Sequence, residues 1–229
     1  MANSLLLESA QHVSTPPQPL NPSTSQLNHL GGYFITGTDT NVGKTFVTAL
    51  LTRNLRNDGH GTVAIKPIAS GSLEDAKVLR AAADNELTLE EITPVFYKAP
   101  LAPCDAAPLE GRVFSCEEVL PRIERLKKKY SSILVEGVGG WLVPLSENYL
   151  LADLARAIGF PVLLVVRNRL GSLNHTLLTL DSIKSYGLTC DGIILNHHPE
   201  DKEDPAIPGY RHFFRKLSKN LNFPIFLEM

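Results

Sequence analysis

Residues 37–45 of the chain read GTDTNVGKT, a glycine-rich stretch that ends in Gly-Lys-Thr. The β-prone residues 33–37 (YFITG) precede it, and apolar residues at helical spacing follow over residues 44–56. A strand, a tight loop and a helix in this order are typical of a phosphate-binding loop, since the loop N–H groups and the positive helix end attract anions. The loop is one residue longer than in the usual motif.

The side chains of this loop have the chemistry that a nucleoside triphosphate and its metal ion require. We expect Lys44 to contact the β- and γ-phosphates and the Thr45 hydroxyl to ligate Mg²⁺. The remaining loop residues would surround the phosphates, and we assign this role to Asp39, Asn41, Val42 and Gly43. An ordinary glycine-rich turn is the alternative, and the flanking strand and helix disfavour it.

The rest of the chain alternates between apolar strands and amphipathic helices. Further strands are predicted at residues 62–65, 132–137, 161–166, 192–196 and 224–227. Helices are predicted at residues 75–83, 150–158, 172–186 and 210–221, and a capping box at residues 115–118 should open another that ends at Lys129. Strands that are apolar along their whole length are buried on both faces, as in parallel sheets. The pattern predicts an α/β fold: a single P-loop NTPase-like domain with a mainly parallel central sheet flanked by helices.

The composition excludes several classes of protein. The 229 residues are 43 % hydrophobic and 20 % charged, with a formal net charge of −2, as in ordinary globular domains. This balance predicts no binding of nucleic acid. No stretch of about 18 apolar residues occurs without a charge or a helix breaker, so we expect no membrane span. The three cysteines form no CxxC pair and indicate reduced thiols in the cytoplasm. On the last predicted helix, the basic residues expected to face solvent are Arg211, Arg215, Lys216 and Lys219.

The first part of the chain differs from the rest. Residues 1–31 contain one charged residue, Glu8, and are rich in Ser, Pro, Asn and Gln. They lack the basic residues of a signal or transit peptide. We therefore expect a disordered tail over residues 1–31 and a folded domain over residues 32–229.

Two further strands end in residues that suit a phosphate site. Lys66 follows the strand at residues 62–65, where a buried lysine requires an anion, and Asp75 begins the next helix. Glu136 ends the apolar part of the strand at residues 132–137, where P-loop proteins place a second Mg²⁺ ligand, although Asp is more usual there. The glycines that follow leave N–H groups able to bind an anion. The alternatives are that Lys66 is an ordinary surface lysine and that Glu136 caps a helix or a loop.

Five segments taken together resemble one enzyme family. They read GTDTNVGKT (37–45), KPIASGS (66–72), LVEGVGGWLVPL (134–145), RLGSLNHTLLTL (169–180) and GIILN (192–196). This ordered set is similar to the dethiobiotin synthetases, and the resemblance covers about residues 33–196. That family closes the ureido ring of dethiobiotin in biotin biosynthesis, from 7,8-diaminopelargonate, CO₂ and ATP, through a carbamate and a carbamic–phosphoric anhydride. The resemblance implies a cyclo-ligase that uses ATP and Mg²⁺ and forms a homodimer.

The resemblance also implies roles for individual residues. Lys44 would hold the phosphates, Lys66 would pair with the carbamate, and Thr40 would bind phosphate oxygens; these are the expected catalytic residues. The expected metal ligands are Thr45, Asp75 and Glu136. The expected nucleotide contacts outside the loop are Glu136, Gly139 and Asn196. The expected substrate contacts are Lys66, Ser70, Gly139, Gly140 and Asn174.

Asn174 and Asn196 are assigned to the periphery of the site. The sequence also departs from the family pattern in two places near this site. By resemblance, Asn174 reaches the site of a dimer partner and meets the substrate carboxylate, whereas Asn196 contacts adenine. The loop at residues 72–75 is shorter than in many relatives. This length affects the position of Asp75, the expected metal ligand at the end of the loop. Leu227 stands where relatives have Gly, close to the end of the chain. We therefore expect weaker base and ribose contacts there, with Glu228 as the residue able to reach the ribose.

Two other functions remain open. A P-loop ATPase switch of the partitioning type usually has a second lysine inside the loop, and residues 38–42 (TDTNV) contain none. A binding protein that keeps the fold without turnover is the other alternative. The presence of Lys44, Lys66, Asp75 and Glu136 argues against it.

Overall fold

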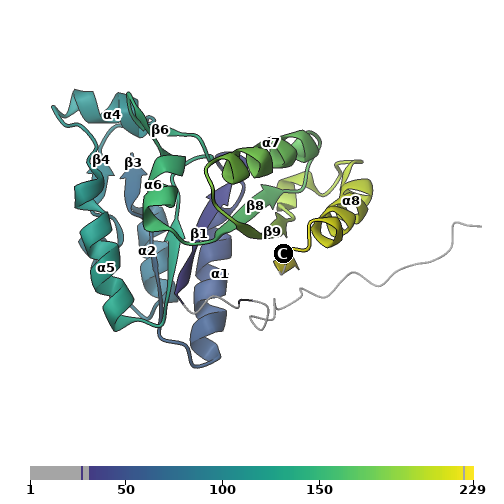
Figure 1. Cartoon of the computed structure of the whole chain (residues 1–229), viewed down its shortest axis with the longest axis horizontal. Helices are drawn as coiled ribbons and strands as arrows, with labels where there is room; N and C mark the ends of the chain where they lie inside the picture. Colours follow the sequence, from purple (N-terminus) through teal and green to yellow (C-terminus); the bar gives the residue numbers. More distant parts are fainter. Residues whose placement is uncertain (1–26, 28–30, 224) are drawn as a thin grey trace, which may run out of the picture.

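The computed structural model describes residue 27, residues 31–223 and residues 225–229, and these form a central six-stranded sheet (Figure 1). Its strands are β1 (Gly32–Gly37), β2 (Thr62–Ile65), β5 (Ser132–Glu136), β8 (Val162–Arg167), β9 (Cys190–Asn196) and β10 (Ile225–Glu228). They lie in the order β10-β9-β8-β1-β5-β2, and every neighbouring pair is parallel. The predicted α/β fold with a mainly parallel sheet is confirmed. The predicted disordered tail lies outside the described residues, apart from Leu27 and Gly31.

Strand β1 lies in the middle of the sheet and determines where a ligand can bind. It pairs with β5 on one side, with Phe34 opposite Val135, and with β8 on the other, with Ile35 opposite Leu163. From β1 the chain goes to the edge strand β2, returns through β5 and then crosses to β8. The loops that follow β1 and its neighbours therefore diverge at the carboxyl edge, which is where such sheets form a ligand-binding crevice.

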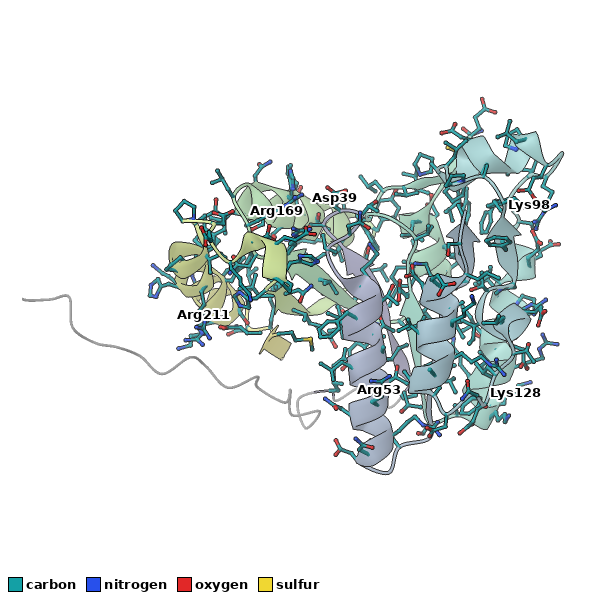
Figure 2. The ribbon with its side chains drawn as sticks, turned by 180° about the vertical axis from the view of Figure 1, so that it is seen from behind. Asp39, Arg53, Lys98, Lys128, Arg169 and Arg211 are labelled. Atoms are coloured by element: carbon teal, nitrogen blue, oxygen red, sulfur yellow. The ribbon has the colours of Figure 1, made fainter. Side chains whose placement is uncertain are left out.

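Helices cover both faces of the sheet. The α-helices are α1 (Lys44–Asn57), α2 (Glu74–Ala82), α3 (Leu89–Ile92), α4 (Pro103–Leu109), α5 (Leu120–Lys129), α6 (Leu151–Ile158), α7 (Ser172–Ser185) and α8 (Ile207–Asn220). Helices α1 and α2 stand in front of the sheet in Figure 2, whereas α6 and α7 stand in front of it in Figure 1. Right-handed crossovers explain this division, because the step from β1 to β2 and the steps from β5 to β9 run in opposite directions across the sheet. Among the described helices, none is long and apolar enough to cross a membrane.

The core forms because the central strands are apolar on both faces. Successive residues of β8 point to opposite faces, so Leu163 packs in the large core cluster and Leu164 in a second, smaller one with Phe214 of α8. All three side chains are fully buried. A strand buried in this way has no polar face, which is the reason that its sequence shows no alternation.

Several short elements were not predicted. Strand β3 (Ile68–Ser70) pairs with β4 (Val95–Tyr97), and β6 (Pro144–Ser146) pairs with β7 (Tyr149–Leu150). The helices α3 and α4, which flank β4 in the chain, were not predicted either. Apart from α4, which has seven residues, these elements have two to four residues. Elements this short show no hydrophobic period, so their position depends on contacts with distant segments.

The capping box predicted at residues 115–118 is wrong. The Ser115 hydroxyl accepts a hydrogen bond from Glu117 N–H at 3.2 Å, and the Glu118 carboxylate instead pairs with Arg112 at 3.0 Å. These residues form a 3₁₀ turn, η2 (Cys116–Glu118), before α5 begins. Pro121 explains the break, since proline lacks an N–H donor and is accommodated in the first turn of a helix rather than in its interior.

Replacing Leu163 with alanine should lower the free energy of unfolding by about 2–5 kcal/mol, because it removes buried methyl groups from a central strand. Urea unfolding followed by circular dichroism measures this change. The control is Leu109→Ala in α4, where the side chain is 69 % exposed and the change should stay within about 0.5 kcal/mol. Equal effects of the two substitutions would contradict the central position of β8.

Candidate functional site

The loop between β1 and α1 adopts a backbone that depends on glycine and on a contact with β9. Gly43 has φ +94°, and a Cβ there would lie 2.1 Å from Asn196 Nδ2. Asn196 comes from the end of β9, and its amide donates to the Val42 carbonyl at 2.9 Å. Asn41 also has a positive φ, of 58°. Asn196 therefore holds the loop, and this contact with Val42 differs from the adenine contact that the resemblance implies.

Lys44 is the cation of this loop. Its side chain is buried, and Nζ donates to the main-chain carbonyl of Asp39 at 3.0 Å. Burial lowers the pKa of Lys44 from the usual 10.5 to about 8, because desolvation outweighs the attraction of Glu136. A phosphate group placed beside Nζ would supply the negative charge that the buried ammonium lacks.

Glu136, at the end of β5, forms hydrogen bonds both with the start of α1 and with Lys66. Its side chain is completely buried, and Oε1 accepts from Thr45 Oγ1 at 2.8 Å and from Lys66 Nζ at 3.0 Å. The other oxygen, Oε2, has no hydrogen-bond partner within the described part of the chain. A buried carboxylate oxygen without a donor is available to a ligand.

Lys66 lies between two carboxylates. Besides Glu136, it donates to Asp75 in the first turn of α2. Burial alone would lower the pKa of Lys66, but the charges of Glu136 and Asp75 and their hydrogen bonds together outweigh it and raise the pKa. Lys66 is therefore held as an ammonium ion.

Two adjoining cavities open onto these residues. The first has a volume of about 420 Å³ and is lined by Thr40, Asn41, Gly43, Lys44, Thr45, Phe46, Lys66, Asp75, Glu136, Gly139, Arg167, His198 and Glu200. The second has a volume of about 710 Å³ and is lined by Thr40, Lys66, Ala69, Ser70, Ser72, Glu74, Asp75, Pro100, Leu101, Ala102, Pro103, Val138, Gly139 and Val143. They share Thr40, Lys66, Asp75 and Gly139. The site therefore has two compartments with one lysine at their border.

The donor set fits Mg²⁺. This ion prefers oxygen ligands and is usually held by one or two carboxylates together with substrate phosphates. Glu136 offers the unpartnered Oε2, and the Thr45 hydroxyl and the Asp75 carboxylate are next to the same cavity. Within the described residues, no group of three or more His, Cys, Asp and Glu side chains gathers as a metal cluster.

Other predicted residues lie at the edges of the site or away from it. Ser70 lines the second cavity, and its buried hydroxyl has no hydrogen-bond partner in the part of the chain that the structure describes. Gly140 lines a third cavity of about 400 Å³, beside Trp141 and α7, together with Asp39 of the loop. Asn174 is exposed on α7 and lines none of these three cavities.

The basic face predicted on α8 is exposed at Arg215, Lys216 and Lys219 and partly buried at Arg211, and two of its arginines also make ion pairs. Arg211 and Arg215 both pair with Glu228 of β10, and Arg215 Nε lies 2.7 Å from Glu228 Oε1. Glu228 is buried by this contact and does not line the first cavity. The ion pairs form because β10 places a carboxylate under the helix, which helical periodicity alone does not indicate.

Four residues that line the first cavity were missed: Phe46, Arg167, His198 and Glu200. Arg167 ends β8, and His198 and Glu200 follow β9, so all three lie beyond carboxyl ends of strands. Their position was the available signal, since that edge of the sheet was already identified as the ligand-binding edge.

Gly43→Ala should weaken binding of Mg·ATP at least about tenfold, because the added Cβ displaces Asn196 and strains the loop. Isothermal titration calorimetry measures the affinity. Gly59→Ala is the matched control: Gly59 also has a positive φ, of 88°, but no atom lies within 4 Å of its Cβ position. Equal affinities of the two variants would contradict the role given to the Gly43 backbone.

Comparison with known proteins shows the fold and the family of the chain. A family model described as an AAA domain matches residues 31–227. The kinase domain of Escherichia coli tyrosine kinase ETK matches with a TM-score of 0.50 and 18 % identity over 74 % of this chain and 68 % of that chain. At this identity the likeness shows the fold alone.

Relatives of higher identity include dethiobiotin synthetases from two bacteria. The ATP-dependent dethiobiotin synthetase BioD of Anaeromyxobacter dehalogenans (strain 2CP-1) is 46 % identical over 182 residues, which cover 77 % of this chain and 81 % of the relative. The enzyme of the same name from Akkermansia muciniphila is 40 % identical over 186 residues, or 81 % of this chain and 87 % of the relative. With these identities over most of its length, the chain belongs to the family of ATP-dependent dethiobiotin synthetases.

Proposed function

We propose that the chain forms dethiobiotin from 7,8-diaminopelargonate, CO₂ and ATP, with Mg²⁺, in biotin biosynthesis. The proposal rests on the position of Lys66 at the border of the two cavities. One of these cavities also contains Lys44, the lysine of the P-loop. A reaction that joins a phosphoryl donor to a second substrate needs such a border, because the reacting oxygen must lie close to the γ-phosphate.

The two cavities suit the two substrates. The first contains Lys44 and the P-loop backbone, which suit the phosphates of ATP. The second has the larger volume, and the apolar residues Leu101, Ala102 and Pro103 are part of its lining. These side chains suit the aliphatic chain of diaminopelargonate.

Lys66 would act on the carbamate. One amine of the substrate adds to CO₂ and loses a proton, and the resulting carbamate oxygen attacks the γ-phosphate as ADP leaves. The second amine then attacks the carbamoyl carbon, phosphate leaves, and the ring closes. Because Glu136 and Asp75 keep Lys66 protonated, its ammonium can pair with the carbamate and with the charge that develops during transfer. Thr40 and Ser70 line the same cavity and would donate hydrogen bonds to these oxygens.

Mg²⁺, when bound, would neutralise charge on the phosphate oxygens. Glu136, Thr45 and Asp75 are the residues that would hold it. Thr45 now donates to Glu136 and would turn its hydroxyl oxygen toward the ion.

We also place the chain in the cytoplasm, on the basis of its free cysteines.

A homodimer is part of the proposal. Leucines on and beside α7 are exposed: Leu170 by 72 %, Leu177 by 46 % and Leu178 by 63 %. Asn174 is exposed on the same helix. A second copy packed on this face would bury the leucines and bring Asn174 toward the site of its partner.

Light scattering after size-exclusion chromatography tests the dimer. We expect the mass of two chains for the wild type and of one chain for Leu178→Asp, because a buried carboxylate without a partner destabilises an apolar interface. Lys128→Asp, on the exposed end of α5, is the control and should remain a dimer. A monomeric wild type at micromolar concentration would contradict this part of the proposal.

Product formation tests the reaction itself. Purified protein with diaminopelargonate, bicarbonate, Mg²⁺ and ATP should yield dethiobiotin by mass spectrometry, with dependence on every component. Lys44→Ala should abolish turnover because the phosphates lose their buried cation. Lys66→Ala should lower turnover at least about a hundredfold but leave most of the ATP affinity, since Lys66 acts on the carbamate.

The outcomes of this experiment separate the alternatives. Full turnover by Lys66→Ala would exclude the carbamate role of that lysine. ATP hydrolysis by the folded wild type without any dethiobiotin would favour an ATPase switch. ATP binding with neither reaction would favour a binding protein.

A further inference from the structure

The loop that follows β5 borders both cavities of the site. We define residues 137–140 as the β5 loop, and its Gly139 lines the first cavity as well as the second. Gly139 has φ +62°, a backbone conformation that favours glycine. A Cβ at Gly140 would lie 3.6 Å from the Cα of Asp39, so the β5 loop lies next to the P-loop backbone. The position of the β5 loop therefore affects the border between the two compartments.

Trp141 holds the end of the β5 loop. Its side chain is 3 % exposed, and the indole Nε1–H donates to the Ser182 hydroxyl of α7 at 3.1 Å. The ring packs edge-on against Phe34 of β1, with 6.4 Å between ring centres, and against Tyr186, which follows α7, with 5.8 Å. A buried indole N–H needs an acceptor, and Ser182 provides it. One side chain thus joins the β5 loop to the central strand and to α7.

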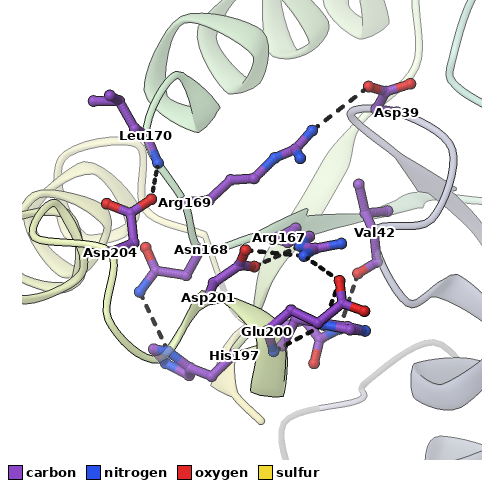
Figure 3. Close-up of polar contacts among 12 residues, drawn as sticks. Asp39, Val42, Arg167, Asn168, Arg169, Leu170, His197, Glu200, Asp201 and Asp204 are labelled. Atoms are coloured by element: carbon purple, nitrogen blue, oxygen red, sulfur yellow. Dashed lines mark hydrogen bonds and ion pairs between the residues drawn. The ribbon is translucent and has the colours of Figure 1, made fainter.

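A second contact joins the start of α7 to the P-loop. Arg169, which precedes α7, extends toward Asp39, with Nη2 at 4.0 Å from Oδ2 (Figure 3). The two side chains are 44 % and 54 % exposed, and an ion pair this exposed contributes little because the solvent screens it. The Trp141 side chain is buried, so water competes less for its hydrogen bond with Ser182. Of these two contacts, the one made by Trp141 is therefore the stronger attachment.

The contact between Trp141 and Ser182 adjoins the face of α7 that is proposed for the dimer. Leu178 precedes Ser182 by one helical turn, and residues three or four apart lie on the same side of a helix. Leu178 is 63 % exposed and lines the third cavity together with Trp141 and Ser182. A second copy that covers Leu178 would therefore also steady the helix to which the β5 loop is attached.

We propose that Trp141 is a positioning residue that fastens the β5 loop to α7 and thereby fixes Gly139 at the border of the two compartments. Trp141 is not among the described residues that line the first or the second cavity, so it acts through the backbone of the loop. A misplacement of about 1 Å at reacting groups can cost about a hundredfold in rate, whereas each ligand can still bind in its own compartment. The inference rests on the proposed function and adds the residue that keeps the two compartments aligned.

The test removes the hydrogen bond from either side. Trp141→Phe keeps an aromatic ring but removes the N–H donor, and Ser182→Ala removes the acceptor. Each should lower kcat in the ring-closure assay about fivefold, as expected for the loss of one hydrogen bond. In calorimetry, the affinity for Mg·ATP should stay within about twofold of the wild type. The double variant should lose no more than either single variant, because both changes remove the same contact.

Two further variants separate alignment from a general effect on α7. Ser182→Thr keeps the hydroxyl acceptor and should retain the kcat of the wild type. Ser185→Ala is the matched control: Ser185 is also a serine at the end of α7, but its hydroxyl donates within the helix, to the Ser182 carbonyl at 2.7 Å. This variant should also retain the kcat of the wild type.

Fluorescence gives a readout that is independent of turnover. Trp141 is the only tryptophan of the chain, so its emission reports on the end of the β5 loop alone. Acrylamide should quench it at least about twice as strongly in Ser182→Ala as in the wild type, because a loosened loop opens more often to the solvent. Ser182→Thr and Ser185→Ala should be quenched as the wild type is.

Three results would overturn the proposal. One is a wild-type kcat in the folded Ser182→Ala protein, which decides the question also if Trp141→Phe does not fold. Another is an equal loss of kcat in Ser182→Thr and Ser182→Ala, which would make the effect one of helix packing. The third is a loss of Mg·ATP affinity as large as the loss of kcat, which would place the effect at the nucleotide. Failure of the proposed function is distinct, because it would appear as a wild type that forms no dethiobiotin. In that case unchanged quenching in Ser182→Ala would still overturn the inference.

Discussion

The buried carboxylate of Glu136 is the charge around which the rest of the site is arranged. A carboxylate with no exposed surface is unfavourable unless donors surround it, and here the donors come from two other elements. Sheet register supplies one of them: Ile65 of β2 lies opposite Val135 of β5, so Lys66 follows beside Glu136. The helix that continues from β1 supplies the other, Thr45. A change in the register of β5 would therefore dismantle the site and the core together.

The nucleotide site is assembled from segments that are far apart in the chain. Val42 of the P-loop is held by Asn196, which is 154 positions away. The 3₁₀ turn η3 (Pro199–Asp201) is held by the ion pair between Arg167 and Asp201. Each contact joins the last residue of one strand to the loop that follows another strand: β9 to the loop after β1, across β8, and β8 to the loop after its neighbour β9. The sheet brings these loops together, and side-chain contacts between them then fix their conformation. Local loosening of β9 would for this reason affect both the phosphate end and the opposite wall of the cavity.

Much of the fold could be predicted from the sequence because its central signals are local. The apolar run in β8 and the strand–loop–helix around Lys44 each occupy one short segment, so their interpretation needs no knowledge of partners. The meeting of Lys66 with Glu136 could also be predicted, since both follow parallel strands and such strands end at one edge. The contact between Arg167 and Asp201 could not, because it joins a strand end to a loop without periodicity.

The same reasoning explains where prediction failed. Glu228 pairs with Arg211 and Arg215 because β10 packs next to α8, and a helical pattern of charges is compatible with solvent or with a buried partner. The capping box at residues 115–118 satisfied a sequence rule, but Pro121 lies in the first turn of α5, and the helix begins at Leu120, after the box. For Asn174, the expected contact depends on a second copy of the chain and stays a prediction.

The difference between the two active-site lysines has a consequence for the energetics of substrate capture. Lys66 is kept charged by its carboxylates, whereas burial lowers the pKa of Lys44 to about 8 in the absence of a ligand. A phosphate beside Lys44 would raise that pKa again, so in mildly alkaline solution nucleotide binding would be accompanied by uptake of a proton from the solvent. The affinity for the nucleotide would then decline as the solution becomes more alkaline, and the heat of association would depend on the protonation enthalpy of the buffer.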